Sequence, residues 1–522
     1  MSISSTIAKN AFFNWITAGA DVAINFFVSI ALARGLGAED YGIYSFLMWF
    51  LSFLVLIVNL GLGEMAKRFI AEAVGAGSKD KVSKIVKLSL FLRGLATAAV
   101  VIFLTVSAGF WAKIFGVPSY ESYFFLLALG LLPNVLNTVL TSIFAGFQKY
   151  EYAAYLALGT NPLRAIAVIV FLALGYGVRE VLIINVTVWA VGVLLGFFLL
   201  HRLISIKEIL TTALPDRANQ RIAIKYAFTV ALVMSLDFFI WDQAEVFFLG
   251  IYRPKEEVGF YSLASKLPSQ VMTLIPLAFG AVILPAVSEQ FGKGDMRTVR
   301  TIYLTSSRYL TMLAFPLAAA GVALAKPLVA FLYGEAYAAA APIMAILFVS
   351  FAMMALDKSP MAIIYGINKP SIALKVGLFL AALNIGLSYW LIPRYGLLGA
   401  AIGSSVPRVL SLILYISFVS KNIKAAWPLK DTLKIAVASA GMGMLVFVLC
   451  NILSPTLGLI LAVPVGLSIY TLELLVFGVV KAGDLRALKG IQHSLPRPLQ
   501  RYCSPVVAMA ERLLGGVLSR ER

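Results

Sequence analysis

A stretch that reads GIYSF at Gly42 and ends KVSKI at Ile85 returns as GFYSL at Gly259 and TVRTI at Ile302. The offset is 259 − 42 = 217 residues, and it holds without a gap over the whole stretch. The residues identical in this register include Gly42/Gly259, Tyr44/Tyr261, Ser45/Ser262, Gly63/Gly280, Glu72/Glu289, Gly75/Gly292, Gly77/Gly294, Val82/Val299 and Ile85/Ile302. Glycine marks turns and close backbone approaches, so four matched glycines indicate two copies of one unit.

The composition is that of a membrane protein. Hydrophobic residues make up 61% of the 522 residues and charged residues 13%, with a mean hydropathy of +0.91. A soluble domain has about 45–50% apolar and about 25% charged residues. The formal net charge of +18 must therefore lie in short loops, in tails or inside a helix bundle. We expect an all-α polytopic membrane protein.

Hydropathy predicts about 14 membrane helices, because each crossing needs about 20 apolar residues. The predicted spans are 10–33, 41–62, 88–110, 122–145, 153–175, 180–200, 224–250, 259–284, 304–333, 339–364, 371–392, 396–419, 432–452 and 456–480. The connecting loops are short, and the longest lies near 202–223. None of these loops can hold a catalytic domain.

The repeat extends over six helices if short insertions are allowed. Gly116 then matches Gly334, the segment 146–149 matches 366–369, and Tyr176-Gly177 matches Tyr395-Gly396. Because six is even, both copies cross the membrane in the same sense, which predicts two parallel six-helix lobes. We expect an N-lobe at 1–205, a C-lobe at 206–422, two extra helices at 423–480 and a basic, partly amphipathic cytoplasmic tail at 481–522.

The distribution of lysine and arginine predicts the orientation in the membrane. Three loops are strongly basic, with Lys67, Arg68, Lys79, Lys81, Lys84 and Lys87 after helix 2, Arg202, Lys207, Arg217, Arg221 and Lys225 after helix 6, and Lys421, Lys424, Lys430 and Lys434 after helix 12. The loops on the other side are poor in basic residues. We therefore expect a multi-pass protein of the cell membrane with both termini in the cytoplasm.

Several acids and amides lie within the predicted spans. Asn14, Asp21 and Asn25 lie on one face of helix 1, and Asp237 and Asp242 lie on helix 7. Intramembrane ionisable groups face the bundle interior or water. These residues therefore either line a cavity or hold helices together. Glu245, close to the outer end of helix 7, is expected to be solvated.

The basic residues within or beside the spans are candidates for binding an anion. We select Lys266, Arg93, Arg408, Lys358 and Arg34, which are spread over both predicted lobes. Lys358 can also pair with the adjacent Asp357, and Lys266 and Arg93 can also extend toward a membrane surface. For Arg164, Arg308 and Lys375 we expect extension toward a helix end.

Several functional classes are excluded by missing motifs. The sequence has no phosphate-binding Walker loop and no serine–histidine–acid arrangement, so we do not expect an enzyme. Its two histidines, His201 and His493, and two cysteines, Cys450 and Cys503, predict neither a metal site nor a disulfide framework. Nothing indicates nucleic-acid binding.

The segment 31–45, which reads ALARGLGAEDYGIYS, resembles the helix 1–2 signature of polysaccharide flippases. These form the polysaccharide transporter family of the multidrug/oligosaccharidyl-lipid/polysaccharide superfamily. The region from Val258 to Lys266, followed by Leu284-Pro285, is similar to their helix 7–8 region, and the two extra helices agree with lipid II flippases. The pattern covers about residues 8–420.

The resemblance implies a flippase that moves a lipid-linked (pyrophosphate) oligosaccharide to the outer leaflet by alternating access, for surface polysaccharide or glycan assembly. Lys266 falls where the family often carries a basic cavity residue. A coupling ion, Na⁺ or H⁺, would use Asp21, Asp237 or Asp242. The expected partners are the lipid-linked oligosaccharide, membrane lipids and polysaccharide assembly enzymes, with the protein as a monomer and no other cofactor.

Two alternatives stay open. In a cation-coupled multidrug and toxic compound antiporter, Asp21 would be the coupling acid. A membrane sugar polymerase would need a large outer loop, which this chain lacks. The sugar and the lipid carrier, undecaprenyl or dolichyl, cannot be deduced from these residues.

The orientation can be tested with single cysteines at Ser78, Lys207 and Lys424. We expect a membrane-impermeant maleimide to label none of them in intact cells and all of them in inverted vesicles. Labelling of any one from outside would contradict the predicted orientation.

Overall fold

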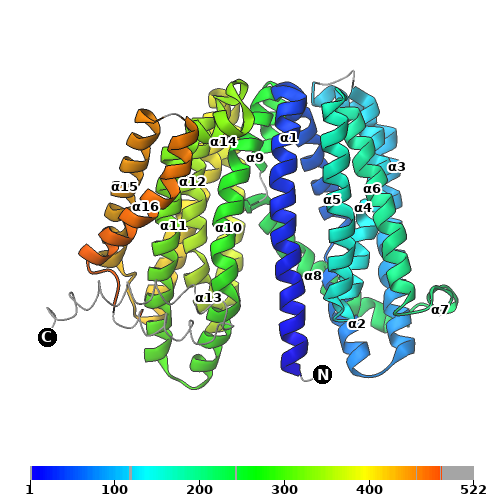
Figure 1. Cartoon of the computed structure of the whole chain (residues 1–522). Coiled ribbons are helices and arrows are strands. Elements are labelled where there is room, and N and C mark those ends of the chain that lie inside the picture. Colours follow the sequence, from blue (N-terminus) through cyan, green and yellow to red (C-terminus); the bar gives the residue numbers. More distant parts are fainter. Residues whose placement is uncertain (1–2, 117–119, 242–243, 454, 482–483, 485–522) are drawn as a thin grey trace. The chain divides into compact units, whose positions relative to one another are not determined.

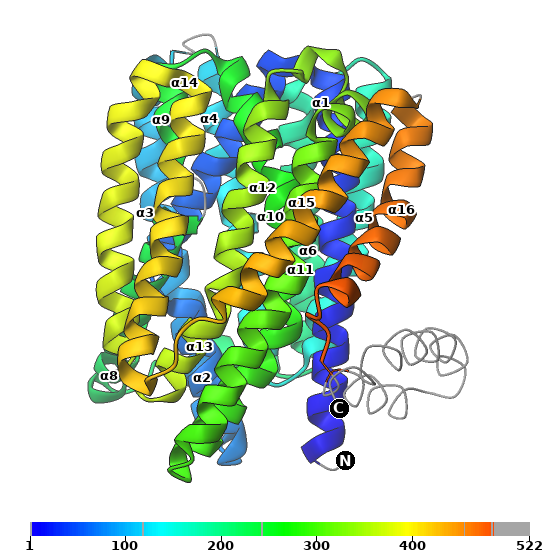
Figure 2. The same ribbon diagram turned by 90° about the vertical axis from the view of Figure 1, so that its left-hand side faces the viewer.

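The computed structural model describes residues 3–116, 120–241, 244–453, 455–481 and 484, and almost all of them are helical (Figures 1 and 2). The helices are α1 (Ile3–Asn59), α2 (Leu62–Gly75), α3 (Lys79–Ile114), α4 (Glu121–Gly146), α5 (Tyr150–Ala173), α6 (Val178–His201), α7 (Ile206–Thr211), α8 (Arg217–Trp241), α9 (Ala244–Tyr252), α10 (Lys255–Gly292), α11 (Met296–Tyr333), η2 (Glu335–Tyr337), α12 (Ala340–Leu356), α13 (Lys358–Gly366), α14 (Pro370–Ile423), α15 (Leu429–Ile452) and α16 (Pro455–Val476). The expected all-α membrane fold is confirmed.

The predicted spans fall on helical parts of the chain: α1 and α14 carry two spans each, while 224–250 covers α8 and α9 and 339–364 covers α12 and α13. Glycine breaks divide α1 at Gly37 (φ 78°) and α14 at Gly396 (φ 53°), where a side chain would be strained. In the described part of the chain, ten helices are long and apolar enough to cross a membrane, and α1 and α14 are among them. With the predicted spans on α8–α9 and α10, this agrees with about 14 crossings.

The described chain divides into two compact units. Unit 1 comprises Met1–Leu267, Leu332–Ile343 and Leu374–Pro407, and unit 2 comprises Pro268–Phe331, Met344–Ala373 and Arg408–Arg522. Unit 1 therefore combines the first predicted repeat with three segments of the second. The predicted lobe boundaries after 205 and 422 stay a prediction.

In unit 1, α1 and α5 run side by side in the same direction (Figure 1). Lys9 Nζ pairs with Glu151 Oε1 at 2.9 Å near the beginning of both helices. Farther along, Gly35 faces Leu172 so closely that a Cβ atom there would lie 3.0 Å from the leucine Cβ. This parallel contact brings the polar faces of the two helices together.

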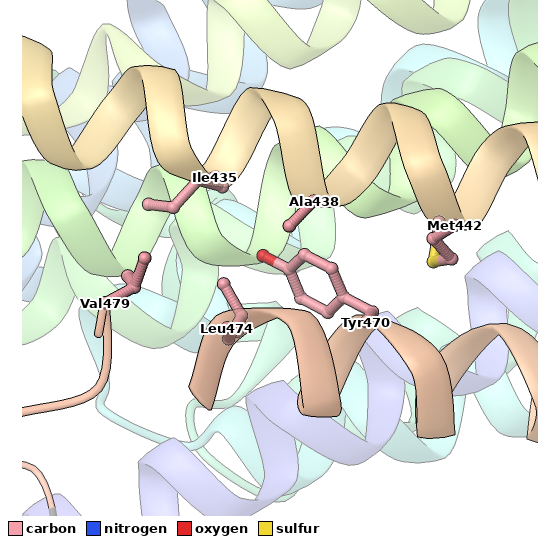
Figure 3. Packing of buried hydrophobic residues seen from close by; sticks show 6 residues of the cluster. All are labelled: Ile435, Ala438, Met442, Tyr470, Leu474 and Val479. Carbon is pink, nitrogen blue, oxygen red and sulfur yellow. The ribbon is translucent and has the colours of Figure 1, made fainter. Parts of the chain in front are cut away.

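In unit 2, the α15–α16 hairpin packs on α11 through a buried apolar cluster (Figure 3). The cluster comprises Ile435, Ala438, Met442, Tyr470, Leu474 and Val479, and it contacts Met312, Phe315, Ala319 and Ala320 of α11. The Tyr470 hydroxyl donates to the Met312 carbonyl oxygen at 2.8 Å. The two extra helices are thus joined to α11 by apolar packing and one hydrogen bond.

A buried ion pair holds the segment after α16 to the same helix. Arg308 of α11 donates to the Asp484 carboxylate and, at 3.3 Å, to the carbonyl oxygen of Val479. The Tyr309 hydroxyl and, at 2.8 Å, the backbone N–H of Lys481 donate to the same carboxylate. The expectation that Arg308 extends toward the surface is therefore wrong, because this carboxylate reaches it inside the protein.

Removing one partner of this pair leaves a buried charge without its counter-charge, which costs about 3–5 kcal/mol. We expect Asp484→Ala and Arg308→Met each to lower the thermal stability of the detergent-solubilised protein. The double variant should lose less thermal stability than the sum of the losses of the two single variants, because removing both partners leaves no unpaired charge. Lys293→Met, which removes an exposed partner of Glu289, is the control and should have no measurable effect. If the stability losses of the two single variants simply add in the double variant, Arg308 and Asp484 do not stabilise each other.

Candidate functional site

A polar cluster lies between α1 and α5 in unit 1. Asn161 Nδ2 donates to Asp21 Oδ1 at 2.5 Å, and Arg164 Nη2 donates to Asn25 Oδ1. Asn25 Nδ2 also donates to the Asp21 carbonyl oxygen at 2.8 Å. Asp21 and Asn25 are four residues apart on α1, so they share one helix face. Asn161 and Arg164 are three residues apart on α5 and share a face in the same way. The helix 1 stripe expected from the sequence therefore has a matching stripe on α5.

Arg164 lies deep in its helix. It follows Tyr150 by 14 residues and precedes Ala173 by nine, which corresponds to about 21 Å and about 14 Å along the axis. The expectation that it extends to a helix end is wrong, because the Asn25 amide binds its guanidinium at this depth. Its Nε–H is buried without a hydrogen-bond partner among the described residues. The cluster thus retains one unused cationic donor.

Lys266 of α10 belongs to the same cluster. Its side chain is half-buried, and Arg164 lies close enough to act on it electrostatically, as it does on Asp21. Two cations and one carboxylate give these three residues a net charge of 2 − 1 = +1. At low dielectric this charge interacts strongly with an anion. Arg164 is therefore the common neighbour of Lys266, Asp21 and Asn25, which were selected separately from the sequence.

A second polar contact in unit 1 surrounds Glu245 of α9. Its Oε1 accepts from Asn384 Nδ2 at 2.8 Å, and its Oε2 accepts from the Tyr261 hydroxyl at 3.2 Å. Only 1% of Glu245 is exposed, so the expectation of a solvated carboxylate is wrong. The structure buries it against α10 and α14, and the neighbouring Ser388 Oγ lacks a partner within the described chain.

The two polar contacts share one offset, which differs from the gap-free offset of 217 found around Gly42. Asn25 binds Arg164, and Glu245 binds Asn384. The offsets are equal, since 245 − 25 = 220 and 384 − 164 = 220. Asn161, Arg164, Glu245 and Asn384 were not selected from the sequence as site residues. The gap-free offset of 217 leads instead from Asn25 to Asp242 and from Arg164 to Ala381, so it would not have indicated this pair.

Arg93 and Arg408 lie in separate buried places. Arg93 of α3 donates to Asn59 Oδ1 and, at 3.3 Å, to Thr138 Oγ1, which connects α1, α3 and α4. Arg408 of α14, in unit 2, donates to Ser350 Oγ at 3.3 Å and stacks 4.2 Å from the Phe351 ring centroid. Both are at most 2% exposed. Their partners hold helices together within each unit.

The other selected residues lie apart from the cluster. Arg34 is exposed, and its Nε donates to the Leu332 carbonyl oxygen at 2.9 Å. It follows Asp21 by 13 residues, about 20 Å along a helix. Lys358 begins α13 in unit 2, next to the buried Asp357, whose carboxylate accepts from Ser411. Asp242 lies outside the described residues, and the side chains of Asn14 and Asp237 are not described either.

With the geometry established, a family model described as "Polysaccharide biosynthesis protein" matches residues 31–342. This covers 342 − 31 + 1 = 312 of the 522 residues, more than half of the chain. The chain belongs to the polysaccharide biosynthesis protein family. The match includes the signature at 31–45 and the α5 and α10 residues of the polar cluster, while Asp21 and Asn25 precede it. It confirms the resemblance that the signature indicates.

Curated members and solved structures agree with this assignment. The chain is 21% identical over 393 residues to the probable low-salt glycan biosynthesis flippase Agl15 of Haloferax volcanii, covering 75% of this chain and 79% of that protein. It is 25% identical over 198 residues to the probable lipid II flippase MurJ of Bdellovibrio bacteriovorus, covering 36% of this chain and 38% of that protein.

The fold is shared with two kinds of solved transporter. The lipid II flippase MurJ in an inward closed conformation superposes with a TM-score of 0.72 at 14% identity, covering 90% of this chain and 98% of that chain. An inward-facing multidrug resistance MATE family transporter superposes with a TM-score of 0.66 at 18% identity, covering 77% and 94%. This polysaccharide biosynthesis family member therefore has the MurJ and MATE fold.

The cluster predicts a stability difference between two asparagines. Asn25→Ala removes the acceptor of a deep guanidinium, and an unsatisfied buried group costs about 1–3 kcal/mol. We expect a lower thermal unfolding temperature in detergent. Asn451→Ala is the matched control, because Asn451 is exposed and its amide bonds only to the carbonyl oxygen of Phe447 in its own helix. Equal effects would show that Asn25 does not support Arg164.

Proposed function

We propose that this protein is a flippase that moves a lipid-linked (pyrophosphate) oligosaccharide from the cytoplasmic to the outer leaflet by alternating access. The observation that carries the proposal is the cationic cluster of Arg164 and Lys266, supported by Asp21, Asn25 and Asn161, deep in the membrane helices. The product would serve surface polysaccharide or glycan assembly. The protein itself would carry out no covalent chemistry.

The chemistry of the cluster fits a phosphate that bears a sugar. A guanidinium presents several N–H donors in a plane and suits phosphate oxygens, and an ammonium adds a compact point charge. Asparagine side chains both donate and accept hydrogen bonds, which suits sugar hydroxyls. A polar head group of this kind needs a hydrated path, while its lipid tail stays among apolar helices.

The relatives support the same substrate class. Agl15 is named a glycan biosynthesis flippase and MurJ a lipid II flippase. Both names describe a flippase, the first one in glycan biosynthesis and the second one of a lipid. We assign phosphate binding first to Lys266 and Arg164. Arg93 and Arg408, predicted for the same role, are held by hydrogen bonds inside their own units, which favours a role in helix packing.

We also propose that transport is coupled to an ion, Na⁺ or H⁺. Asp21 is the carboxylate of the cationic cluster and remains a candidate. Glu245 is a second candidate, because its buried carboxylate accepts from the Asn384 amide, whose own Oδ1 lacks a partner within the described residues. Asp237 and Asp242 remain predictions from the sequence.

A multidrug antiporter is the second candidate function. The MATE-like fold and the intramembrane Asp21 favour it. The adjacent Arg164 and Lys266 oppose it, because two cations in a low-dielectric site repel a cationic drug. We place the protein in the cell membrane as a monomer with both termini in the cytoplasm, acting beside polysaccharide assembly enzymes.

The substrate assignment is tested by the lipid-linked saccharide that accumulates on the cytoplasmic leaflet in cells lacking the protein. We expect Lys266→Ala and Arg164→Ala each to reduce transport at least about tenfold, which corresponds to about 1.4 kcal/mol. Lys266→Arg should be milder because it keeps the charge. Membrane insertion should be unchanged.

Lys79→Ala and Lys84→Ala are the controls, since both remove exposed or half-exposed basic residues at the beginning of α3. Normal transport by Lys266→Ala and Arg164→Ala would refute the cationic binding site. If deletion leaves lipid-linked saccharides unchanged and sensitises cells to cationic drugs, the antiporter function is correct instead.

A further inference from the structure

Two repeat-equivalent segments of unit 1 contact each other backbone to backbone. A Cβ atom on Gly42 of α1 would lie 1.8 Å from the Lys255 carbonyl oxygen and 3.2 Å from the Gly259 nitrogen. A Cβ atom on Gly259 of α10 would lie 2.8 Å from the Ala38 carbonyl oxygen and 3.1 Å from the Gly42 nitrogen. Only glycine at both positions allows this approach.

The contact is reciprocal in the register of the repeat. Gly42 meets Lys255, and Gly259 meets Ala38. The offsets are identical, since 259 − 42 = 217 and 255 − 38 = 217. In a two-fold symmetric interface, residue i contacts residue j and j contacts i. A local two-fold axis therefore passes between the two glycines, and we name this contact the glycine seam.

Aromatic rings join α1 to α8 and α9 about two to three turns farther along α1. Trp49 stacks on Phe53 with ring centroids 5.8 Å apart, and it lies 6.2 Å from Phe238 of α8 and 5.6 Å from Phe247 of α9. The Trp49 indole N–H is buried with no hydrogen-bond partner in the described structure. A buried unsatisfied donor costs free energy that water or a hydroxyl group would recover on opening.

Two further hydrogen bonds attach the same end of α1 to the second repeat. The Tyr337 hydroxyl donates to the Ala33 carbonyl oxygen at 2.7 Å, and Arg34 Nε donates to the Leu332 carbonyl oxygen at 2.9 Å. The loops at this end are poor in basic residues, which predicts that it faces outward. These contacts between the two repeats therefore lie at the predicted outer end of unit 1, while α2 packs on α8 at its predicted inner end.

We propose that the glycine seam and the Trp49 aromatic layer are the outer gate of the transport path. This inference rests on the proposed flippase function. The gate closes when Gly42 and Gly259 meet, and it opens when α1 separates from α10. Opening exposes the Trp49 indole N–H to water and to the hydroxyl groups of the departing saccharide.

The first test measures opening without any substrate. Ser45→Cys and Ser262→Cys are small probes one turn beyond the two glycines, in a background with Cys450→Ser and Cys503→Ser. Gly42→Ala should raise labelling by an impermeant maleimide from outside at least about fivefold, the factor expected when a contact worth about 1 kcal/mol is lost. Gly259→Ala should have a smaller effect, because its Cβ atom meets the backbone at 2.8 Å rather than 1.8 Å.

Gly75→Ala and Gly292→Ala are the matched controls. They are also equivalent at an offset of 217, and a Cβ atom at either position meets nothing within 4 Å. Their labelling should equal that of the parent. If Gly42→Ala reaches the membrane and its labelling is also unchanged, the gate is refuted. If the Gly42→Ala variant fails to reach the membrane, the labelling of Gly259→Ala and a cross-link across the gate test the proposal in its place.

The second test holds the gate closed. Trp49→Cys and Phe247→Cys, joined by a short cleavable bifunctional maleimide, should stop transport, and cleavage should restore it. Each single cysteine variant treated with the reagent is the control. Full transport by the cross-linked protein refutes the gate, even where Lys266→Ala still abolishes transport. If labelling responds as expected but lipid-linked saccharide movement never depends on the protein, the gate stands and the proposed substrate is wrong.

Discussion

Charged and amide groups within the membrane need partners, and this constraint organises the polar interior of the chain. Arg164 binds Asn25, Arg93 binds Asn59, and Arg308 binds the carboxylate of Asp484. Each bond joins two segments distant in sequence, because lipid offers no hydrogen bonds of its own. The same bonds that satisfy these groups therefore determine which helices pack together.

Glycine has the complementary role of letting backbones approach. Each of the two longest helices contains two consecutive membrane crossings. Gly37 in α1 and Gly396 in α14 adopt a positive φ and separate those crossings. Gly42 and Gly259 bring two backbones into contact at the end of unit 1. A backbone contact of this kind carries no side-chain interlocking. It is therefore suited to a surface that must open and close during each transport cycle.

The sign of the charge at the polar cluster separates the two functions that this fold supports. An exporter of cationic drugs benefits from a carboxylate such as Asp21. Arg164 lies beside that carboxylate and acts on Lys266 as well, and the two cations favour an anion. A pyrophosphate between a sugar and a lipid is such an anion, and the amides of Asn25 and Asn161 add neutral donors and acceptors suited to hydroxyl groups. The cluster thus favours the lipid-linked saccharide.

The sequence by itself determined the membrane class, the helical spans, the repeat and the family, because composition, hydropathy and glycine spacing are properties of the chain alone. Only the tertiary structure decided which ionisable residues meet. Arg164 and Arg308 were expected at the surface and Glu245 in solvent, yet all three are held inside by partners at least 139 residues away. Whether a charge is solvated or paired depends on neighbours from other helices, and the spacing along one helix does not contain that information.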